Sequence, residues 1–175
     1  MKRSLITLSV VGLMLAGVAG AAVQKGDTEL ELAGNFMYTN LADLDGEGGG
    51  TQTSYSVRVG GGYFVTDNIR LGASINGMWV GSINAYGVNL DAKYHFMPTN
   101  QLVPYAGAQF GAGMADAGGL SETATTYMYG PLAGVRWELN EKNDFFVEYQ
   151  FQLWGGDRIF DNLHTVMFGI VHQFK

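Results

Sequence analysis

The chain has no cysteine, few prolines and little charge. Its 175 residues include 3 Pro, and 15% of them are charged, against about a quarter in ordinary soluble domains. Without cysteine there can be no disulfide framework, no thiolate nucleophile and no thiolate zinc ligand. Lys and Arg together number 10 against 16 Asp and Glu. This balance argues against nucleic-acid binding, which needs clustered cations.

Glycine and aromatic residues are abundant instead. The chain holds 26 Gly, 13% of its residues are aromatic and 47% are hydrophobic. An apolar content this high excludes intrinsic disorder, and the length predicts a single domain. The fold has to explain why a chain with so few charges carries so many aromatic and glycine residues.

The N-terminus has the three parts of a secretory signal peptide. Lys2 and Arg3 form a basic start, residues 5–18 form a short apolar run, and a small-residue cleavage motif ends at Ala21. A spanning helix needs about 20 apolar residues, which is more than this run offers. We predict a signal peptide over residues 1–21 and one mature domain over residues 22–175. Removing two basic residues takes the formal net charge from -6 to -8.

Apolar residues alternate with polar or small ones along most of the mature chain. Because strand side chains point to opposite faces in turn, a period of two predicts half-buried strands. No position of the apolar rows is Asp, Glu, Lys or Arg. The rows predict eight strands, over residues 30–38, 52–65, 69–79, 86–96, 104–112, 127–137, 145–151 and 166–174.

Three features predict that the apolar rows face lipid. Aromatic residues gather near the ends of these rows, as in the girdles of membrane barrels. The polar rows hold many Gly and Ser residues, which suit a crowded interior. Strands of about 10 residues, rising about 3.3 Å each with a tilt near 40°, cross roughly 25 Å of apolar band. We therefore predict an all-β fold, an eight-stranded antiparallel transmembrane up-and-down barrel. A soluble lipocalin-type barrel with an apolar interior is the alternative.

The polar rows also carry charged residues of both signs. Five acids and four bases share these rows, so the predicted interior has a formal net charge of -1. We predict that they neutralise one another as a polar plug, the alternative being a narrow channel for small solutes. The predicted interior charge network comprises Glu29, Glu31, Arg58, Arg70, Asp91, Lys93, Arg136, Glu138 and Glu148.

Short and long connections alternate, as expected when turns lie on one side of a membrane and loops on the other. Asp43, Asp45 and Glu47 lie in the first long connection and are followed by glycines. Alternate acids followed by glycine can wrap a hard cation, but the full twelve-residue calcium pattern is absent. These residues are therefore a weak candidate cation site in a solvated acidic loop. We expect no resident metal and no cofactor.

Catalytic signals are weak. Acyl or peptide hydrolysis needs a nucleophile, a base and an orienting acid that converge on one site. The nearest approach is His164 and Thr165 with Ser121 or Asp161. His95 is expected on an inward row beside Lys93, and His172 on an outward row. We expect that the protein is not an enzyme.

Two stretches carry a family resemblance. Residues 102–111 read LVPYAGAQFG, and residues 133–139 read AGVRWEL before FVEYQF at residues 146–151. They resemble the small eight-stranded outer-membrane β-barrel family, which comprises the OmpA-type transmembrane domain and its free-standing relatives. The resemblance covers the mature chain in architecture.

The resemblance implies the outer membrane of a Gram-negative bacterium. The implied partners are outer-membrane lipid, lipopolysaccharide and the barrel assembly machinery, with a monomeric state and no nucleic acid. Family members end in an aromatic residue that the machinery reads, which here is Phe174, followed by Lys175. The expected function is a structural envelope role with acidic extracellular loops. The alternatives are a small porin-like channel and a barrel for surface adhesion or partner binding.

Overall fold

The protein is described by a computed structural model that covers residues 23–40, 51–80, 83–117, 124–156 and 162–174. These residues contain no helix long and apolar enough to cross a membrane. The predicted signal peptide, residues 1–21, lies outside them. The strands are β1 (Thr28–Asn40), β2 (Thr51–Phe64), β3 (Ile69–Val80), β4 (Ile83–His95), β5 (Leu102–Ala117), β6 (Ala124–Asn140), β7 (Asn143–Gly156) and β8 (Asn162–Phe174).

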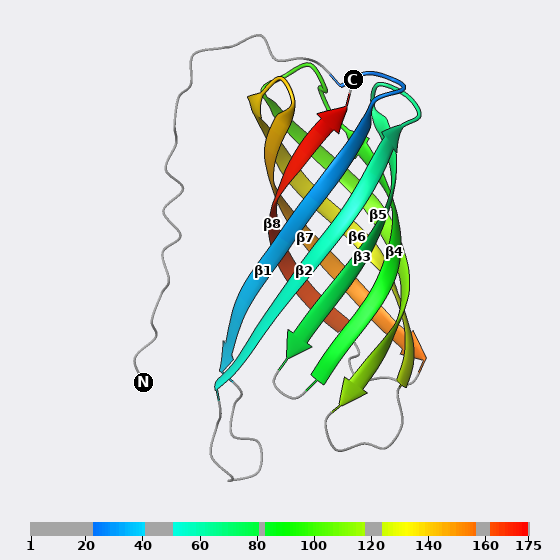
Figure 1. Ribbon diagram of the computed structural model, residues 1–175, viewed down its shortest axis with the longest axis vertical. Helices are drawn as coiled ribbons and strands as arrows, with labels where there is room; N and C mark the ends of the chain where they lie inside the picture. The colour runs from blue at the N-terminus through cyan, green and yellow to red at the C-terminus, as the bar shows by residue number, and fades with distance from the viewer. Residues whose placement is uncertain (1–22, 41–50, 81–82, 118–123, 157–161, 175) are drawn as a thin grey trace.

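The strands close into one antiparallel barrel (Figure 1). Each strand pairs with the next along the chain, and β8 pairs back with β1. Residues 65–68, 96–101 and 141–142 connect strands at one end, here named the turn end, where both ends of the described chain also lie. The opposite end is named the loop end. The predicted eight-stranded up-and-down barrel is confirmed.

Several strands run further than their apolar rows. β5 continues to Ala117, and β6 begins at Ala124 and has 17 residues. Polar residues such as Asp116 and Thr125 occupy the added positions. Backbone pairing continues beyond the part of each strand that has an apolar face. Alternation of apolar and polar residues therefore predicts the middle of each strand better than its ends.

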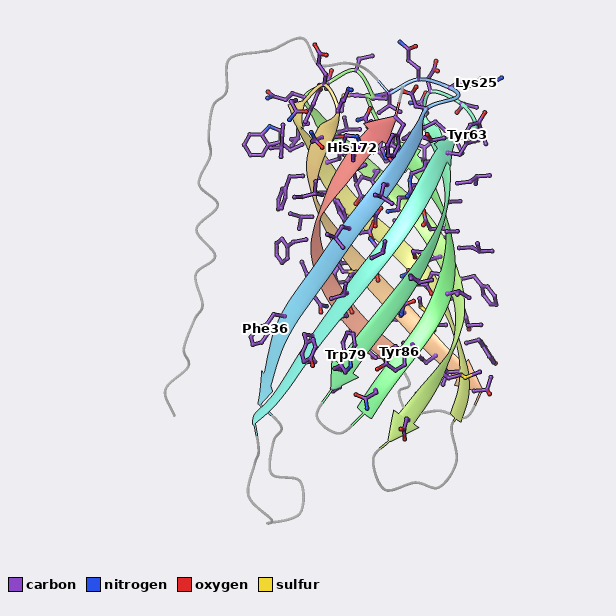
Figure 2. The ribbon with its side chains drawn as sticks, viewed as in Figure 1. Lys25, Phe36, Tyr63, Trp79, Tyr86 and His172 are labelled. Carbon is purple, nitrogen blue, oxygen red and sulfur yellow. The ribbon has the colours of Figure 1, made fainter. Side chains whose placement is uncertain are left out.

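The barrel is apolar outside and polar inside (Figure 2). Phe36, Tyr63, Trp79, Tyr86 and His172 lie on its outer surface, and the Phe36 side chain is 70% exposed. The described residues form only one small buried apolar cluster, of Ala33, Phe146, Met167 and Val171. A soluble lipocalin-type barrel would bury its apolar rows, so this distribution is opposite to the one that the alternative requires.

Candidate functional site

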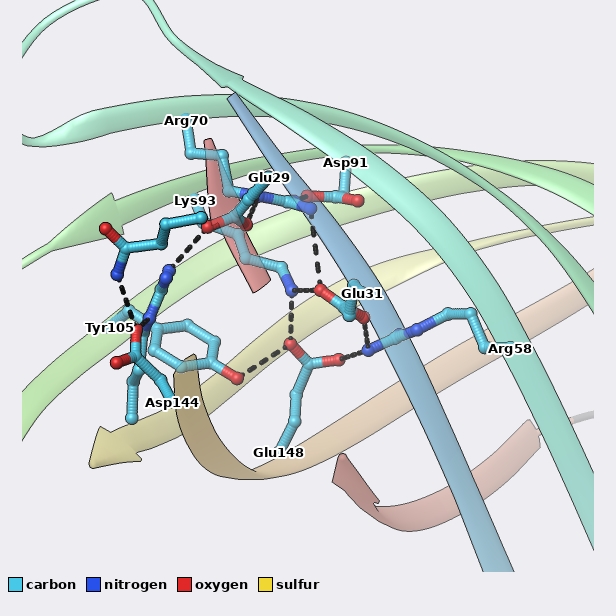
Figure 3. Close-up of polar contacts among 11 residues, drawn as sticks. Glu29, Glu31, Arg58, Arg70, Asp91, Lys93, Tyr105, Asp144 and Glu148 are labelled. Atoms are coloured by element: carbon cyan, nitrogen blue, oxygen red, sulfur yellow. Dashed lines mark hydrogen bonds and ion pairs between the residues drawn. The ribbon is translucent and has the colours of Figure 1, made fainter. Parts of the chain in front are cut away.

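Charged side chains from the polar rows meet inside the barrel (Figure 3). Seven of them are at most 5% exposed, and the Asp91 side chain is 12% exposed. We name this set, together with Asp144, the interior network. Its predicted members are Glu29, Glu31, Arg58, Arg70, Asp91, Lys93, Arg136 and Glu148.

Arg70 and Arg136 organise the part of the interior network nearest the turn end. The Arg70 guanidinium forms ion pairs with Glu29 and, at 2.5 Å, with Asp91. The Arg136 Nη1 lies 2.7 Å from the other oxygen of Glu29, and its Nε donates to Asp144. Glu29 therefore bridges two guanidinium groups from β3 and β6.

Glu148 and Glu31 organise the part nearer the middle of the barrel. Glu148 is fully buried and lies 2.8 Å from Arg58 and 2.7 Å from Lys93. Glu31 lies 2.5 Å from Arg58 and 3.4 Å from Lys93. Two carboxylates and two cations thus alternate in a closed ring (Figure 3). Tyr105 adds a hydrogen bond of 3.0 Å from its hydroxyl to Glu148.

The structure adds one residue to the predicted set. Asp144, at the start of β7, is 2% exposed and pairs with Arg136, although it was not predicted. Extending the inward row of β7 back from Phe146 would have found it. Glu138 lies at the turn-end rim, where its backbone N–H donates to the carbonyl of Gln101.

The interior network contacts every strand of the barrel. Glutamine side chains extend it, because Gln150 donates to Glu148 at 2.7 Å and Gln173 donates to Asp144 at 2.8 Å. One contributor can be named for each strand from β1 to β8: Glu29, Arg58, Arg70, Lys93, Tyr105, Arg136, Glu148 and Gln173.

The network balances charge almost completely. It holds five carboxylates and four cations, which gives a formal net charge of -1. Buried ions lose their hydration, and only close pairing with additional hydrogen bonds compensates for that loss. The cavity that remains among these groups is only about 10 Å³. The arrangement fills the lumen with fixed, paired charge.

A larger recess lies above the interior network, toward the loop end. Its cavity volume is about 50 Å³. Arg58 lies at its boundary with the network, and Gln150 and Gln152 continue up its wall. Its other lining side chains are mostly uncharged, including Asn76, Met78, Ala85, Asn89, Thr126, Met128, Trp154, Leu163, Thr165 and Met167.

The histidines lie apart from one another. His95 is 1% exposed and packs between the rings of Phe64 and Tyr105. His164 lies on the outer surface, where its Nδ1 is 2.6 Å from the Tyr149 hydroxyl. Ser121 and Asp161, the other candidates for hydrolysis, lie outside the described residues.

His172 lies near the turn end on the outer face. Its Nδ1 is 2.9 Å from the amide oxygen of Asn143, and its ring contacts Phe174. Within the described ranges, no group of three or more His, Asp or Glu side chains is placed to hold a metal ion. The candidate cation site of Asp43, Asp45 and Glu47 falls in segment 41–50, which is not described.

The chain matches known proteins in family and in fold. A family model described as the outer membrane protein beta-barrel domain matches residues 8–174. A comparison with curated protein sequences gives no match.

Solved structures share the barrel architecture. Neisserial surface protein A is 19% identical with a TM-score of 0.65, and the match covers 86% of this chain and 97% of that one. The N-terminal barrel domain of Pseudomonas aeruginosa OprF is 19% identical with a TM-score of 0.62, covering 86% and 99%. OprG, from the same organism, is 13% identical with a TM-score of 0.51, covering 88% and 98%. At these identities the likeness shows the fold.

Proposed function

The chain belongs to the outer membrane protein beta-barrel family and lies in the cell outer membrane, and we propose that it has a structural envelope role there with a closed lumen. The observation that carries this proposal is the interior network, which crosses the lumen and contacts all eight strands. An eight-stranded barrel is only wide enough for side chains to fill. Fixed ion pairs therefore serve as a plug and as a cross-brace, which suits a structural rather than an enzymatic role.

The orientation that we propose places the turn end in the periplasm. Outer-membrane barrels have short periplasmic turns and longer extracellular loops. The loop end then presents Asp43, Asp45 and Glu47 outside the cell. Acidic extracellular loops would account for much of the formal net charge of -6, since the interior network is close to neutral.

The partners that we propose follow from the outer surface. Its apolar rows suit contact with lipid tails, and the loop end lies at the level of lipopolysaccharide. Phe174 is 51% exposed at the last described position of β8, where the barrel assembly machinery could read it. We propose a monomer, because β1 and β8 already pair with each other near the turn end.

Conductance in planar bilayers tests the closed lumen. Pure wild-type protein should give no defined single-channel steps. Replacing the ring of Glu31, Arg58, Lys93 and Glu148 by alanines removes two charges of each sign, so steps should then appear. Leu90→Ala, on the lipid-facing surface, should remain silent. Steady wild-type steps would contradict the plug and favour the porin-like channel.

A second experiment tests the envelope role in cells. Deleting the gene should raise sensitivity to bile salts and leakage of periplasmic protein, and wild-type protein should restore both to normal. The variant with alanines in place of the four ring residues should restore bile-salt resistance and protein retention only in part, because its lumen is open. A deletion strain with an unaltered barrier would contradict a structural role.

A further inference from the structure

Two polar side chains at the wall of the recess keep an unused hydrogen-bonding group. Arg58 on β2 and Asn76 on β3 are direct cross-strand partners, and both line the recess. The Arg58 Nε is a buried donor and the Asn76 Oδ1 is a buried acceptor, and neither makes a hydrogen bond within the described residues. Because a buried donor or acceptor without a partner is costly, the two atoms favour a ligand that supplies one.

The donor and the acceptor are held close together. Directly opposed residues of antiparallel strands have β-carbons about 4.5–5.5 Å apart. Arg58 is also fixed at its far end, because its Nη2 lies 2.5 Å from Glu31 and 2.8 Å from Glu148 (Figure 3). The Arg58 Nε–H and the Asn76 Oδ1 therefore form a preorganised pair.

The charge around this pair favours a neutral ligand. Arg58 is the one charged side chain among the described residues that line the recess. Its charge is compensated by Glu31 and Glu148, so an anion would have to compete with two carboxylates. A cation would lie beside the guanidinium and be repelled by it. A neutral molecule meets neither repulsion.

The size of the recess limits the ligand to a very small molecule. A cavity needs about 10–15 Å³ to hold one water molecule, and the volume of the recess is about 50 Å³. It therefore has room for about four non-hydrogen atoms. Sites for larger organic ligands occupy about 300–1,000 Å³, so a sugar, a peptide or an acyl chain does not fit.

The rest of the wall supplies fixed amides and adaptable apolar groups. Gln152 donates to Gln150 at 2.8 Å, and Gln150 donates to Glu148 at 2.7 Å. Because these amides are already held in place, little side-chain freedom is lost when a ligand binds. Met128 and Met167 also line the recess, and their flexible thioethers adapt to irregular shapes.

We propose that the recess binds a small neutral amide, such as acetamide or urea, from the loop end of the barrel. The carbonyl oxygen of the ligand accepts a hydrogen bond from the Arg58 Nε, and its N–H donates to the Asn76 Oδ1. One planar molecule of the right size then satisfies both groups. The interior network closes the other side of the recess, so the ligand binds without crossing the barrel.

Titration with acetamide and acetone tests the site. The two molecules have the same shape, but acetone carries a methyl group in place of the NH₂ group and cannot donate a hydrogen bond. In folded protein with isotope-labelled methionine methyl groups, acetamide should shift the NMR signals of Met78, Met128 and Met167, which line the recess. The shifts should saturate with a Kd in the millimolar range, because so few atoms make contact. Met114, which is 62% exposed on the outer face, should not respond.

Acetone should bind about tenfold more weakly than acetamide, because it makes one hydrogen bond fewer. Asn76→Leu removes the acceptor and should weaken acetamide binding to a similar extent, while acetone binding stays unchanged. Asn100→Leu, at an exposed turn position, is the matched control and should bind acetamide as the wild type does. Ala85→Leu fills the recess from β4 and should abolish the binding of both molecules. Heat-modifiable gel mobility shows whether each variant has folded.

Two outcomes would overturn the site. Equal affinity for acetamide and acetone would show that the donor and the acceptor do not select the ligand. Methionine signals that do not shift, or that shift without saturation and equally at Met114, would show that the recess holds water only. Both outcomes can be observed with wild-type protein, so they do not depend on the folding of a variant. Neither alters the conductance result, so this site can fail while the closed lumen stands.

Discussion

Arg70 brings carboxylates from two strands together inside the barrel. Its guanidinium contacts Glu29, Asp91 and, at 3.4 Å, Glu31, and its side chain is 2% exposed. Removing one partner of a buried ion pair leaves the other charged and uncompensated, at a cost of about 3–5 kcal/mol. Arg70 therefore stabilises the barrel because its removal would leave buried carboxylates without their cationic partner.

We expect Arg70→Met to lower the free energy of unfolding by about 3–5 kcal/mol. Urea titration of the protein in phospholipid vesicles, followed by tryptophan fluorescence, measures the change. Lys142→Met, at an exposed turn position, is the control and should change stability by about 0.5 kcal/mol or less. Equal stability of the two variants would show that the interior network does not brace the barrel.

Gly107 allows two strands to approach closely inside the barrel. A β-carbon there would collide with the backbone carbonyl oxygen of Ala92 on β4. At Gly61, on the outer face of β2, the nearest atom to such a carbon is the Glu29 carbonyl oxygen at 3.4 Å, an ordinary contact. The two glycines therefore differ in how much space surrounds them.

Gly107→Ala should destabilise the barrel by about 1–3 kcal/mol through overpacking, and Gly61→Ala should be close to neutral. The same urea titration distinguishes them. If Gly61→Ala proves as damaging as Gly107→Ala, the cause is backbone conformation in strands generally and not the approach of β4 to β5.

Phe174 and Phe168 are matched aromatic residues on β8. Both lie on the outer face, 51% and 50% exposed. If the assembly machinery reads the C-terminal aromatic residue, Phe174→Ala should slow the appearance of the folded, heat-modifiable form in cells several-fold. Phe168→Ala should have little effect. Equal rates for the two variants would contradict an assembly signal at Phe174.

At the scale of the strand, the sequence predicts the fold well because one physical demand repeats. Each apolar row has to meet lipid, so alternation marks the middle of all eight strands. The ends of the strands do not have to face lipid, so alternation predicts them less accurately, as at Ala117 and Ala124. The strands predicted over residues 127–137 and 145–151 extend toward each other in the structure, because β6 runs to Asn140 and β7 starts at Asn143.

Pairing inside the barrel could not be predicted from one sequence. Arg136 and Glu29 are 107 residues apart, and only closure of the barrel brings them to 2.7 Å. Asp144 was missed because the inward row of β7 was not extended back from Phe146.

For the molecule as a whole, the composition follows from its environment. The outer surface needs apolar and aromatic residues, whereas the lumen needs small residues and a few charges that pair. Four cationic side chains lie in the lumen, where each is at most 5% exposed: Arg58, Arg70, Lys93 and Arg136. The low charge content thus reflects an inside-out arrangement in which lipid replaces the usual solvent.

The most direct test of this arrangement is a cysteine scan along β3 in vesicles that contain a lipid-borne nitroxide quencher. A fluorescent label at Leu71, Ala73 or Ile75 should be strongly quenched, because these side chains face outward. The same label at Ser74, Asn76 or Met78 should be quenched weakly. Quenching that varies with a period of two in this phase supports the barrel described here, and a uniform or reversed pattern would contradict it.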